Sequence, residues 1–155
     1  MIIGIDPGPL QSAIVVVGRD GNVLESLKDR NDMILAKLRA YVGERVAIEM
    51  VQSFGMPVGA EVFETVFWIG RFAEVVSDTV VRINRGEVKT HHCRSSKAND
   101  SHIRQALVDR YGGKDAAIGR KANPGPLYGV KGDCWQALAV ALVAQDRYLA
   151  IPRAA

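Results

Sequence analysis

The stretch Ile2-Ile3-Gly4-Ile5-Asp6-Pro7-Gly8, directly after Met1, decides the fold. It is a short apolar run that ends in a carboxylate and a turn signature. A second run, Gln11–Gly18, is rich in valine and isoleucine, and a tight turn at 19–22 separates it from a third run, Val23–Lys28. Apolar runs joined by such short turns are typical of strands that pair as an antiparallel meander. The sequence therefore predicts three antiparallel strands in its first thirty residues.

Beyond the meander, helical and strand-like patterns alternate. Apolar residues at helical spacing predict helices over 31–42, Ala60–Ser77 and Asp133–Leu149, whereas Arg45–Met50 and Thr79–Ile83 have the composition of buried strands. This order predicts an α/β fold with one five-stranded mixed sheet flanked by helices, in which three antiparallel strands are followed by parallel ones.

Three local expectations complete this pattern. Asn31 or Asp32 is expected near the cap of the first helix, and residues 112–132, with six glycines and two prolines, are expected to form a mobile basic loop. The apolar side of the helix at Ala60–Ser77 is expected to consist of Val62, Phe63, Val66, Phe67, Ile69, Gly70 and Ala73.

Length and composition limit the class of protein. The chain has 155 residues, of which 48% are hydrophobic and 24% charged, so residues 1–155 are expected to form a single globular domain. Its longest strictly apolar run, 137–144, is far shorter than the roughly 20 residues that span a bilayer. The N-terminal residues lack the pattern of a secretion signal, and Cys93 and Cys134 are too few for a disulfide framework. The expected location is the cytoplasm, away from membranes.

The basic residues are concentrated in one part of the chain. Residues 82–131 contain eleven Lys or Arg and four Asp or Glu, whereas the rest of the chain contains nine and thirteen. A basic part beside an acidic part favours a surface that binds a polyanion such as nucleic acid. The plain alternative is chance clustering on solvated helices.

Three acidic residues fall at the ends of predicted elements. Asp6 ends the first strand, Glu49 interrupts the buried run at Arg45–Met50, and Asp133 begins the last helix. Each has an ordinary explanation as well: a turn for Asp6, a position past the strand end for Glu49, and helix capping for Asp133. If the fold is as predicted, the three carboxylates converge on one edge of the sheet.

Such a convergence favours a metal-dependent hydrolytic site. Carboxylate ligands prefer Mg²⁺, with Mn²⁺ as a substitute. Two ions about 4 Å apart, one activating water and one stabilising the leaving oxygen, would then cleave a phosphodiester.

The same motifs resemble those of RuvC-type Holliday junction resolvases, in a phage-like form. The resemblance is carried by Ile3-Gly4-Ile5-Asp6-Pro7-Gly8, by Ala47-Ile48-Glu49, and by Asp133-Cys134-Trp135-Gln136-Ala137-Leu138-Ala139, in the family's order and spacing. It implies an RNase H-like fold, a homodimer, and Mg²⁺-dependent cutting of two opposed strands of a four-way or branched DNA junction. It also implies a bacterial or phage-infected host cell.

The resemblance assigns metal-binding roles, with one departure. Asp6, Glu49 and Asp133 would be catalytic metal ligands. The family has a fourth acid three residues after the last of these, where this chain has Gln136, an uncharged ligand. Two outcomes are open: a lower metal affinity, or compensation by Asp100 or a group near it.

Basic residues are the expected contacts to DNA. Val88-Lys89 resembles a family pair whose lysine lies near the cleaved phosphate, so Lys89 is also a candidate catalytic residue. A second family lysine falls at Asp100, and Lys97 is its nearest substitute; solvated charges remain the alternative for both lysines. The predicted DNA-binding residues of the basic segment are Arg85, Lys89, Arg94, Lys97, Lys121 and Lys131.

Phe54 is the expected aromatic contact. Resolvases of this type place an aromatic residue shortly after the second acid, where it stacks on an unpaired base at the crossover. Phe54 follows Glu49 by five residues, a longer spacing than in the bacterial enzymes, and a core position is the alternative. If a dimer forms, the helix at Ala60–Ser77 is the expected interface.

Three functions fit these observations. The first is junction-resolving cleavage. The second is a branched-DNA-binding protein on the same fold, weak or silent in catalysis because of Gln136. The third is an RNase H-like nuclease that acts on an RNA–DNA hybrid or on other branched DNA.

Overall fold

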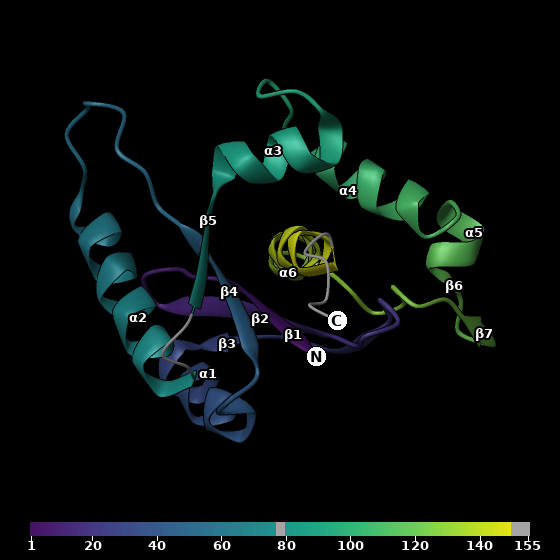
Figure 1. Ribbon diagram of the computed structural model, residues 1–155, viewed down its shortest axis with the longest axis horizontal. Coiled ribbons are helices and arrows are strands. Elements are labelled where there is room, and N and C mark those ends of the chain that lie inside the picture. Colours follow the sequence, from purple (N-terminus) through teal and green to yellow (C-terminus); the bar gives the residue numbers. More distant parts are fainter. Residues whose placement is uncertain (77–79, 150–155) are drawn as a thin grey trace, which may run out of the picture.

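The computed structural model describes residues 1–76 and 80–149, and its centre is a five-stranded sheet (Figure 1). The strands lie in the order β3-β2-β1-β4-β5, with β1 antiparallel to β2 and parallel to β4. β2 and β3 are antiparallel, and β4 and β5 are parallel. The strands are β1 (Ile2–Asp6), β2 (Gln11–Val17), β3 (Val23–Arg30), β4 (Arg45–Met50) and β5 (Val80–Asn84). The expected mixed sheet is confirmed.

Helices cover both faces of this sheet. They are α1 (Asn31–Leu38), the short 3-10 helix η1 (Arg39–Tyr41), α2 (Ala60–Val76), α3 (Arg85–Cys93), α4 (Asp100–Arg110), α5 (Lys114–Ala117) and α6 (Cys134–Leu149). α1 and α2 pack on one face, and α6 packs on the other, with α3, α4 and α5 forming a layer outside it (Figure 1). No helix among the described residues is long and apolar enough to cross a membrane.

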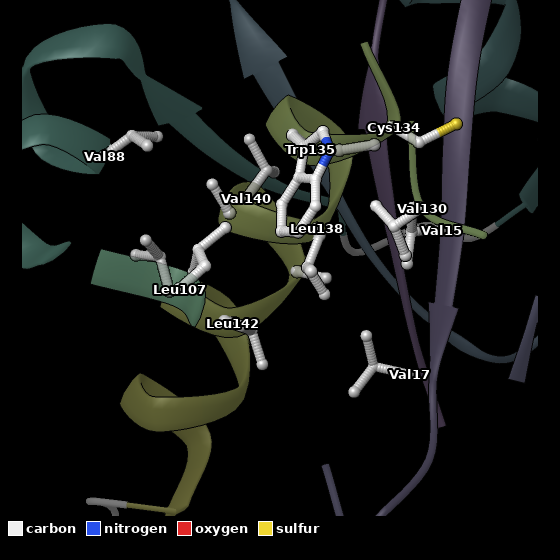
Figure 2. Packing of buried hydrophobic residues seen from close by; sticks show 14 of the residues in the cluster. Val15, Val17, Val88, Leu107, Val130, Cys134, Trp135, Leu138, Val140 and Leu142 are labelled. Atoms are coloured by element: carbon white, nitrogen blue, oxygen red, sulfur yellow. The ribbon is translucent and has the colours of Figure 1, made fainter. Parts of the chain in front are cut away.

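The helix α6 is the middle of the larger core. It is apolar nearly all round because the sheet covers one side and the outer helices the other. Figure 2 shows its side chains Leu138 and Leu142 between Val15 and Val17 of β2 and Leu107 of α4. The predicted buried last helix is therefore present, from Cys134 onward.

Gly4 allows α6 to approach the sheet closely. A Cβ atom on Gly4 would lie 2.0 Å from the carbonyl oxygen of Ala137 and 2.8 Å from the Cβ of Ala141. Only a residue without a side chain fits at this crossing. The glycine of the opening motif is thus a packing requirement that sets the distance between β1 and α6.

Asn31 is the first residue of α1, next to the cap as expected, but its side chain has another role. The N-cap residue of α1 is Arg30, and its side chain makes no capping hydrogen bond. Asn31 is buried instead, where its Oδ1 accepts a hydrogen bond from Ser12 Oγ at 2.6 Å and its Nδ2 donates to Gly8 O at 2.9 Å. The side chain fixes the turn after β1 because a buried amide needs partners for both its donor and its acceptor.

The expectation of a mobile loop at 112–132 is wrong. The segment contains α5 and a two-stranded hairpin, β6 (Gly119–Arg120) and β7 (Asn123–Pro124). Leu127 and Val130 are buried in the core around α6. The glycines are needed for tight backbone approaches: a Cβ on Gly125 would lie 2.3 Å from Ala116 O. Glycine content here marks close packing and turns.

The expected apolar side of α2 is only partly buried. The residues that face the core are Thr65, Ile69, Phe72 and Val76. Phe63, Val66, Phe67 and Gly70 are exposed, so they form an outer apolar stripe on α2. Position 77 of the predicted helix and position 79 of the predicted fifth strand lie outside the described residues.

Candidate functional site

Strand register brings two of the predicted acids side by side. In the parallel pair β1–β4, Ile5 is the partner of Ile48, so the next residues, Asp6 and Glu49, lie at the same level near the carboxyl ends of the two strands. Both side chains point to the face of the sheet that α6 covers, because side chains alternate along a strand. Glu49 is in turn the register partner of Ile83, the residue before the end of β5.

The third acid approaches from α6. Asp133 directly precedes this helix, which packs against β1. Burial, reinforced by the negative charges of Glu49 and Asp133, raises the pKa of Asp6 from 3.8 to about 7. Burial also raises the pKa of Glu49, against the lowering effect of Arg85. Burial and the neighbouring carboxylates thus disfavour the charged form of Asp6, and burial disfavours that of Glu49.

The carboxylates fit a divalent cation. Glu49 Oε2 is buried and accepts no hydrogen bond from the described part of the chain, which is costly for a carboxylate oxygen. A hard cation relieves both this unpaired acceptor and the mutual repulsion with Asp6. In the conformation described, residues 1–76 and 80–149 contain no ready-made group of three or more metal-ligating side chains. Lys28 and Arg85, two cations of the chain itself, lie against the acids instead.

Lys28 is a site residue that the sequence analysis missed. Its Nζ donates to Asp133 Oδ2 at 2.6 Å, which raises the pKa of the lysine. The register explains its position, because Asp6 is the partner of Ala13 and Ala13 is the partner of Lys28. The three residues form one row across the sheet on the same face. Deriving the register of the three antiparallel strands from the two turns between them would have identified Lys28.

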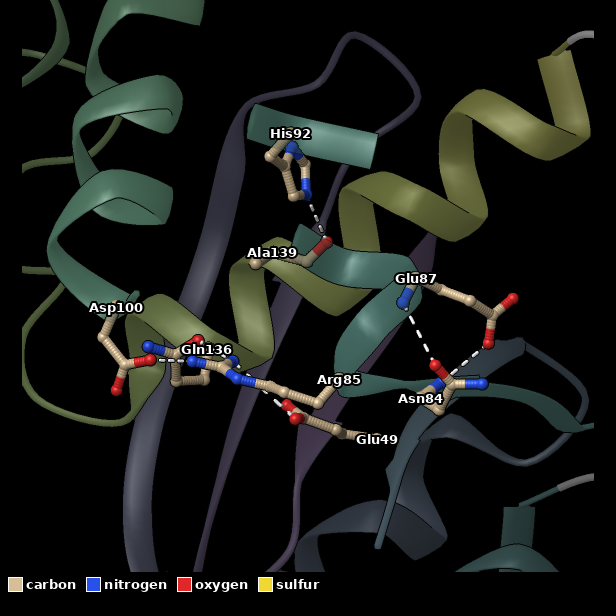
Figure 3. Close-up of polar contacts among 8 residues, drawn as sticks. All are labelled: Glu49, Asn84, Arg85, Glu87, His92, Asp100, Gln136 and Ala139. Carbon is tan, nitrogen blue, oxygen red and sulfur yellow. Dashed lines mark hydrogen bonds and ion pairs between the residues drawn. The ribbon is translucent and has the colours of Figure 1, made fainter. Parts of the chain in front are cut away.

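Arg85 lies on the other side of the acids. Its Nη1 donates to Gln136 Oε1 at 2.5 Å and lies 3.7 Å from Glu49 Oε1, while its Nη2 contacts the carboxylate of Asp100 (Figure 3). Arg85 therefore links Gln136 to Asp100, the residue that is expected to compensate for the missing fourth acid.

The remaining basic candidates lie farther from the three carboxylates than Lys28 and Arg85 do. Lys89 is half-buried in α3, on the helix face of Arg85 because the two are four residues apart. Lys131 is exposed two residues before Asp133. Arg94 is the exposed C-cap residue of α3, and Lys97 faces a surface pocket beside α4. Lys121 lies in the β6–β7 hairpin, at the far end of the outer layer in Figure 1.

Phe54 is not a core residue. It lies in the loop between β4 and α2 with 84% of its surface exposed, and Met56 beside it is also exposed. Figure 1 shows this loop extending beyond the carboxyl end of β4, away from the sheet. The structure therefore separates Phe54 from the carboxylates but leaves it free to contact a ligand that lies over that edge.

Comparisons with known proteins are informative only at the level of structure. No protein-family model matches the sequence, and no curated protein matches it. Thermus thermophilus RuvC matches with a TM-score of 0.61 and 18% identity over 96% of this chain and 95% of that one. The same enzyme in complex with a Holliday junction substrate matches with a TM-score of 0.66 and 18% identity, over 96% of this chain and 94% of that one. The Fowlpox virus resolvase in complex with substrate Holliday junction DNA matches with a TM-score of 0.54 and 14% identity, over 95% of this chain and 99% of that one.

These likenesses define the fold. The chain has the RNase H-like α/β fold of RuvC, with the same five-stranded mixed sheet and flanking helices over nearly its whole length. The fold expected from the sequence and its resemblance to RuvC-type resolvases are confirmed at this level.

Proposed function

We propose that this chain is a metal-dependent, structure-selective endodeoxyribonuclease that resolves four-way DNA junctions by paired nicking, as a crossover junction hydrolase. One observation carries the proposal: at the edge of a RuvC fold, burial together with the negative charges of Glu49 and Asp133 raises the pKa of Asp6 to about 7. A domain of 1–155 acting in the cytoplasm of a bacterial or phage-infected cell fits this role.

The chain's own residues suit hydrolysis of a phosphodiester. Asp6, Glu49 and Asp133 would hold the divalent ion, with Gln136 as a neutral neighbour. Mg²⁺, or Mn²⁺ in its place, would supply the positive charge that activates water and stabilises the developing charge on the phosphate. Lys28 and Arg85 then neutralise charge beside the acids. Lys89, on the same helix face as Arg85, extends this positive charge toward the DNA.

The outer layer of helices suits the DNA backbone. The basic segment 82–131 forms α3, α4, α5 and the β6–β7 hairpin, which together lie on one side of α6 (Figure 1). Arg94, Lys97 and Lys121 are exposed on this layer, and Lys131 follows it. Contacts from such residues to phosphates release counterions, so junction binding is expected to weaken steeply with salt.

Phe54→Ala is expected to weaken junction binding about 5- to 150-fold, because stacking of one base on an aromatic ring contributes about 1–3 kcal/mol. The measurement is the Kd for a fluorescent four-way junction, with a linear duplex of the same arms alongside. The duplex should bind both proteins equally, since its bases are all paired.

Met56→Ala is the matched control for Phe54, because Met56 is exposed in the same loop but has no ring. It should change the junction Kd by less than about threefold. An equal loss in the two variants would mean that the loop contributes only apolar surface, and would argue against stacking.

The outer stripe of α2 suits a second copy of this chain. Phe63, Val66, Phe67 and Gly70 recur at the spacing of one helix face, and their exposure leaves a continuous apolar strip. Cutting two symmetry-related strands requires two sites, which a twofold dimer provides. We propose that this strip is the homodimer interface.

Phe67→Glu is expected to convert the dimer to a monomer, because a charge would be buried in an apolar contact. Light scattering after size-exclusion chromatography measures the mass directly. On a supercoiled cruciform plasmid, the monomer should leave single nicks where the wild type linearises the plasmid. Leu24→Glu places the same charge on an equally exposed leucine of the edge strand β3 and should remain dimeric. A dimeric Phe67→Glu protein would refute this interface.

The proposed function is tested by cleavage of a synthetic four-way junction, a linear duplex and an RNA–DNA hybrid in Mg²⁺, Mn²⁺ and EDTA. Paired symmetric nicks in the junction alone, absent in EDTA, are the expected result. Cutting of the hybrid would instead indicate an RNase H-like nuclease of another specificity. Binding of the junction without any cutting would favour the second candidate below.

One observation favours that second candidate, a branched-DNA-binding protein without catalysis. Gln136 replaces an acid, and Lys28 and Arg85 contact two of the three remaining carboxylates. A chain that neutralises part of its acidic cluster with its own cations depends less on a metal ion to fold. Metal-dependent turnover separates the two candidates.

A further inference from the structure

Arg85 is held rigidly at its backbone. It is the first residue of α3, directly after β5, and the turn before it is closed by a reciprocal capping arrangement. Glu87 N donates to Asn84 Oδ1 at 3.0 Å, and Asn84 N donates to Glu87 Oε2 at 2.8 Å (Figure 3). The side chain of Arg85 is only 27% exposed. The guanidinium is therefore a fixed part of the site.

The acceptors around the guanidinium differ in charge. Gln136 is neutral, so its hydrogen bond to Nη1 orients Arg85 without cancelling the positive charge. Asp100, in contrast, is 71% exposed, which makes it the partner that an incoming anion displaces most easily. The planar fork of an arginine matches the oxygens of a phosphate as well as those of a carboxylate.

The net charge of the site matches that of one divalent ion. The site contains four carboxylates and two basic side chains: Asp6, Glu49, Asp100, Asp133, Lys28 and Arg85. With all of these ionised, two negative charges remain, and one divalent ion neutralises them. A second ion would add an excess of positive charge at a position where Gln136 offers no carboxylate.

We propose that Arg85 replaces a second metal ion: the site holds one divalent ion, and Arg85 binds a non-bridging oxygen of the scissile phosphate. This inference rests on the proposed function and adds a catalytic residue to it. On DNA binding, Arg85 exchanges Asp100 for the phosphate and keeps its hydrogen bond to Gln136. The guanidinium transfers no proton, since it stays charged throughout, and it stabilises the negative charge that develops on the phosphate oxygens.

Counting bound ions tests the charge balance without reference to activity. Mn²⁺ bound by the full chain is titrated by electron paramagnetic resonance, with and without a four-way junction, after subtracting the ions that the junction binds alone. The wild type is expected to bind one ion per chain. The double variant Arg85→Gln/Gln136→Asp, which removes the fixed cation and adds a carboxylate, is expected to bind two. Two ions on the wild type, or one on the double variant, would overturn the proposal.

Single-turnover cleavage tests the contact with the phosphate. Arg85→Gln is expected to slow cleavage about 10²- to 10³-fold, the effect of removing one preorganised donor from a transition state. Arg85→Lys, which keeps the charge but loses the fork, should recover at least tenfold of this loss. Arg19→Gln, in the exposed turn at the opposite end of the sheet, should cut at the wild-type rate. Equal rates for Arg85→Gln and wild type, or equal losses with glutamine and lysine, would refute the role.

The two proposals fail in different ways. If the wild type cuts no DNA under any metal, the nuclease function is refuted, while the number of Mn²⁺ ions per chain still decides whether Arg85 excludes a second one. If the wild type cuts junctions but binds two ions, only the role of Arg85 is refuted.

Discussion

Asp6→Asn is expected to reduce junction cleavage by at least about 10³-fold while leaving junction binding within about threefold of wild type. Asp6 is the central carboxylate of the site, coupled to both Glu49 and Asp133. An asparagine keeps the shape but provides neither the charge nor the paired oxygens that a divalent ion needs. The expected loss is of the size seen when a main electrostatic contribution to a transition state is removed.

Asp20→Asn is the matched control for this change. Asp20 lies in the exposed turn between β2 and β3, where it accepts hydrogen bonds from Asn22, far from the carboxyl end of β1. It should cleave at the wild-type rate. Cleavage by Asp6→Asn within tenfold of wild type would refute the assignment of Asp6 as a metal ligand.

Measuring the Tm of Asp6→Asn distinguishes a loss of catalysis from unfolding of the variant. Folding raises the pKa of Asp6 from 3.8 to about 7, so the folded chain binds this proton more tightly than the unfolded chain. The resulting stabilisation is therefore present at low pH and is lost as pH rises from about 4 to about 7. Asparagine does not titrate, so in EDTA the Tm of Asp6→Asn should exceed that of wild type increasingly over this range. A lower Tm at pH 8 would indicate that the substitution damages the fold.

Gly4→Ala is expected to destabilise the fold by about 3 kcal/mol or more, at the upper end of overpacking effects. The added methyl would lie 2.0 Å from Ala137 O, a backbone atom that moves only if the helix α6 moves. Displacing α6 opens the interface with β1 and β2, which is the largest part of the core. Denaturant unfolding followed by circular dichroism measures the loss.

Gly59→Ala is the control for Gly4, because it adds the same methyl group at an exposed loop position with no atom within 4 Å. It should change the free energy of unfolding by less than about 0.5 kcal/mol, as surface substitutions usually do. If Gly4→Ala were as mild, the close approach of β1 and α6 would not be a constraint on the sequence.

Periodicity and strand-end acids predicted most of the architecture and the centre of the site. Asp6 and Glu49 were found because an ionisable residue at the end of an apolar run stands out, and parallel strands bring such ends together. Lys28 was missed because a lysine on a meander strand has an ordinary explanation as a solvated charge. Only the register Asp6–Ala13–Lys28 makes it a site residue.

The errors have a common physical origin. Residues 112–132 as a loop and the outer stripe of α2 as part of the apolar side were both inferred from local preference. In both cases the tertiary partner decides the outcome: the core around α6 for Leu127, and solvent or a second chain for Phe67. Single-sequence patterns carry no information on these partners.

The close packing of β1 against α6 joins elements that are far apart along the chain. β1 precedes the other described elements, and α6, which crosses β1 at Gly4, follows them. A nascent chain can pair β1 with β2 and β3 early, but its larger core stays open until α6 emerges. The carboxylates of Asp6 and Asp133 meet only at that moment. A chain that stops before α6 therefore contains Asp6 and Glu49 but cannot complete the cluster of three carboxylates.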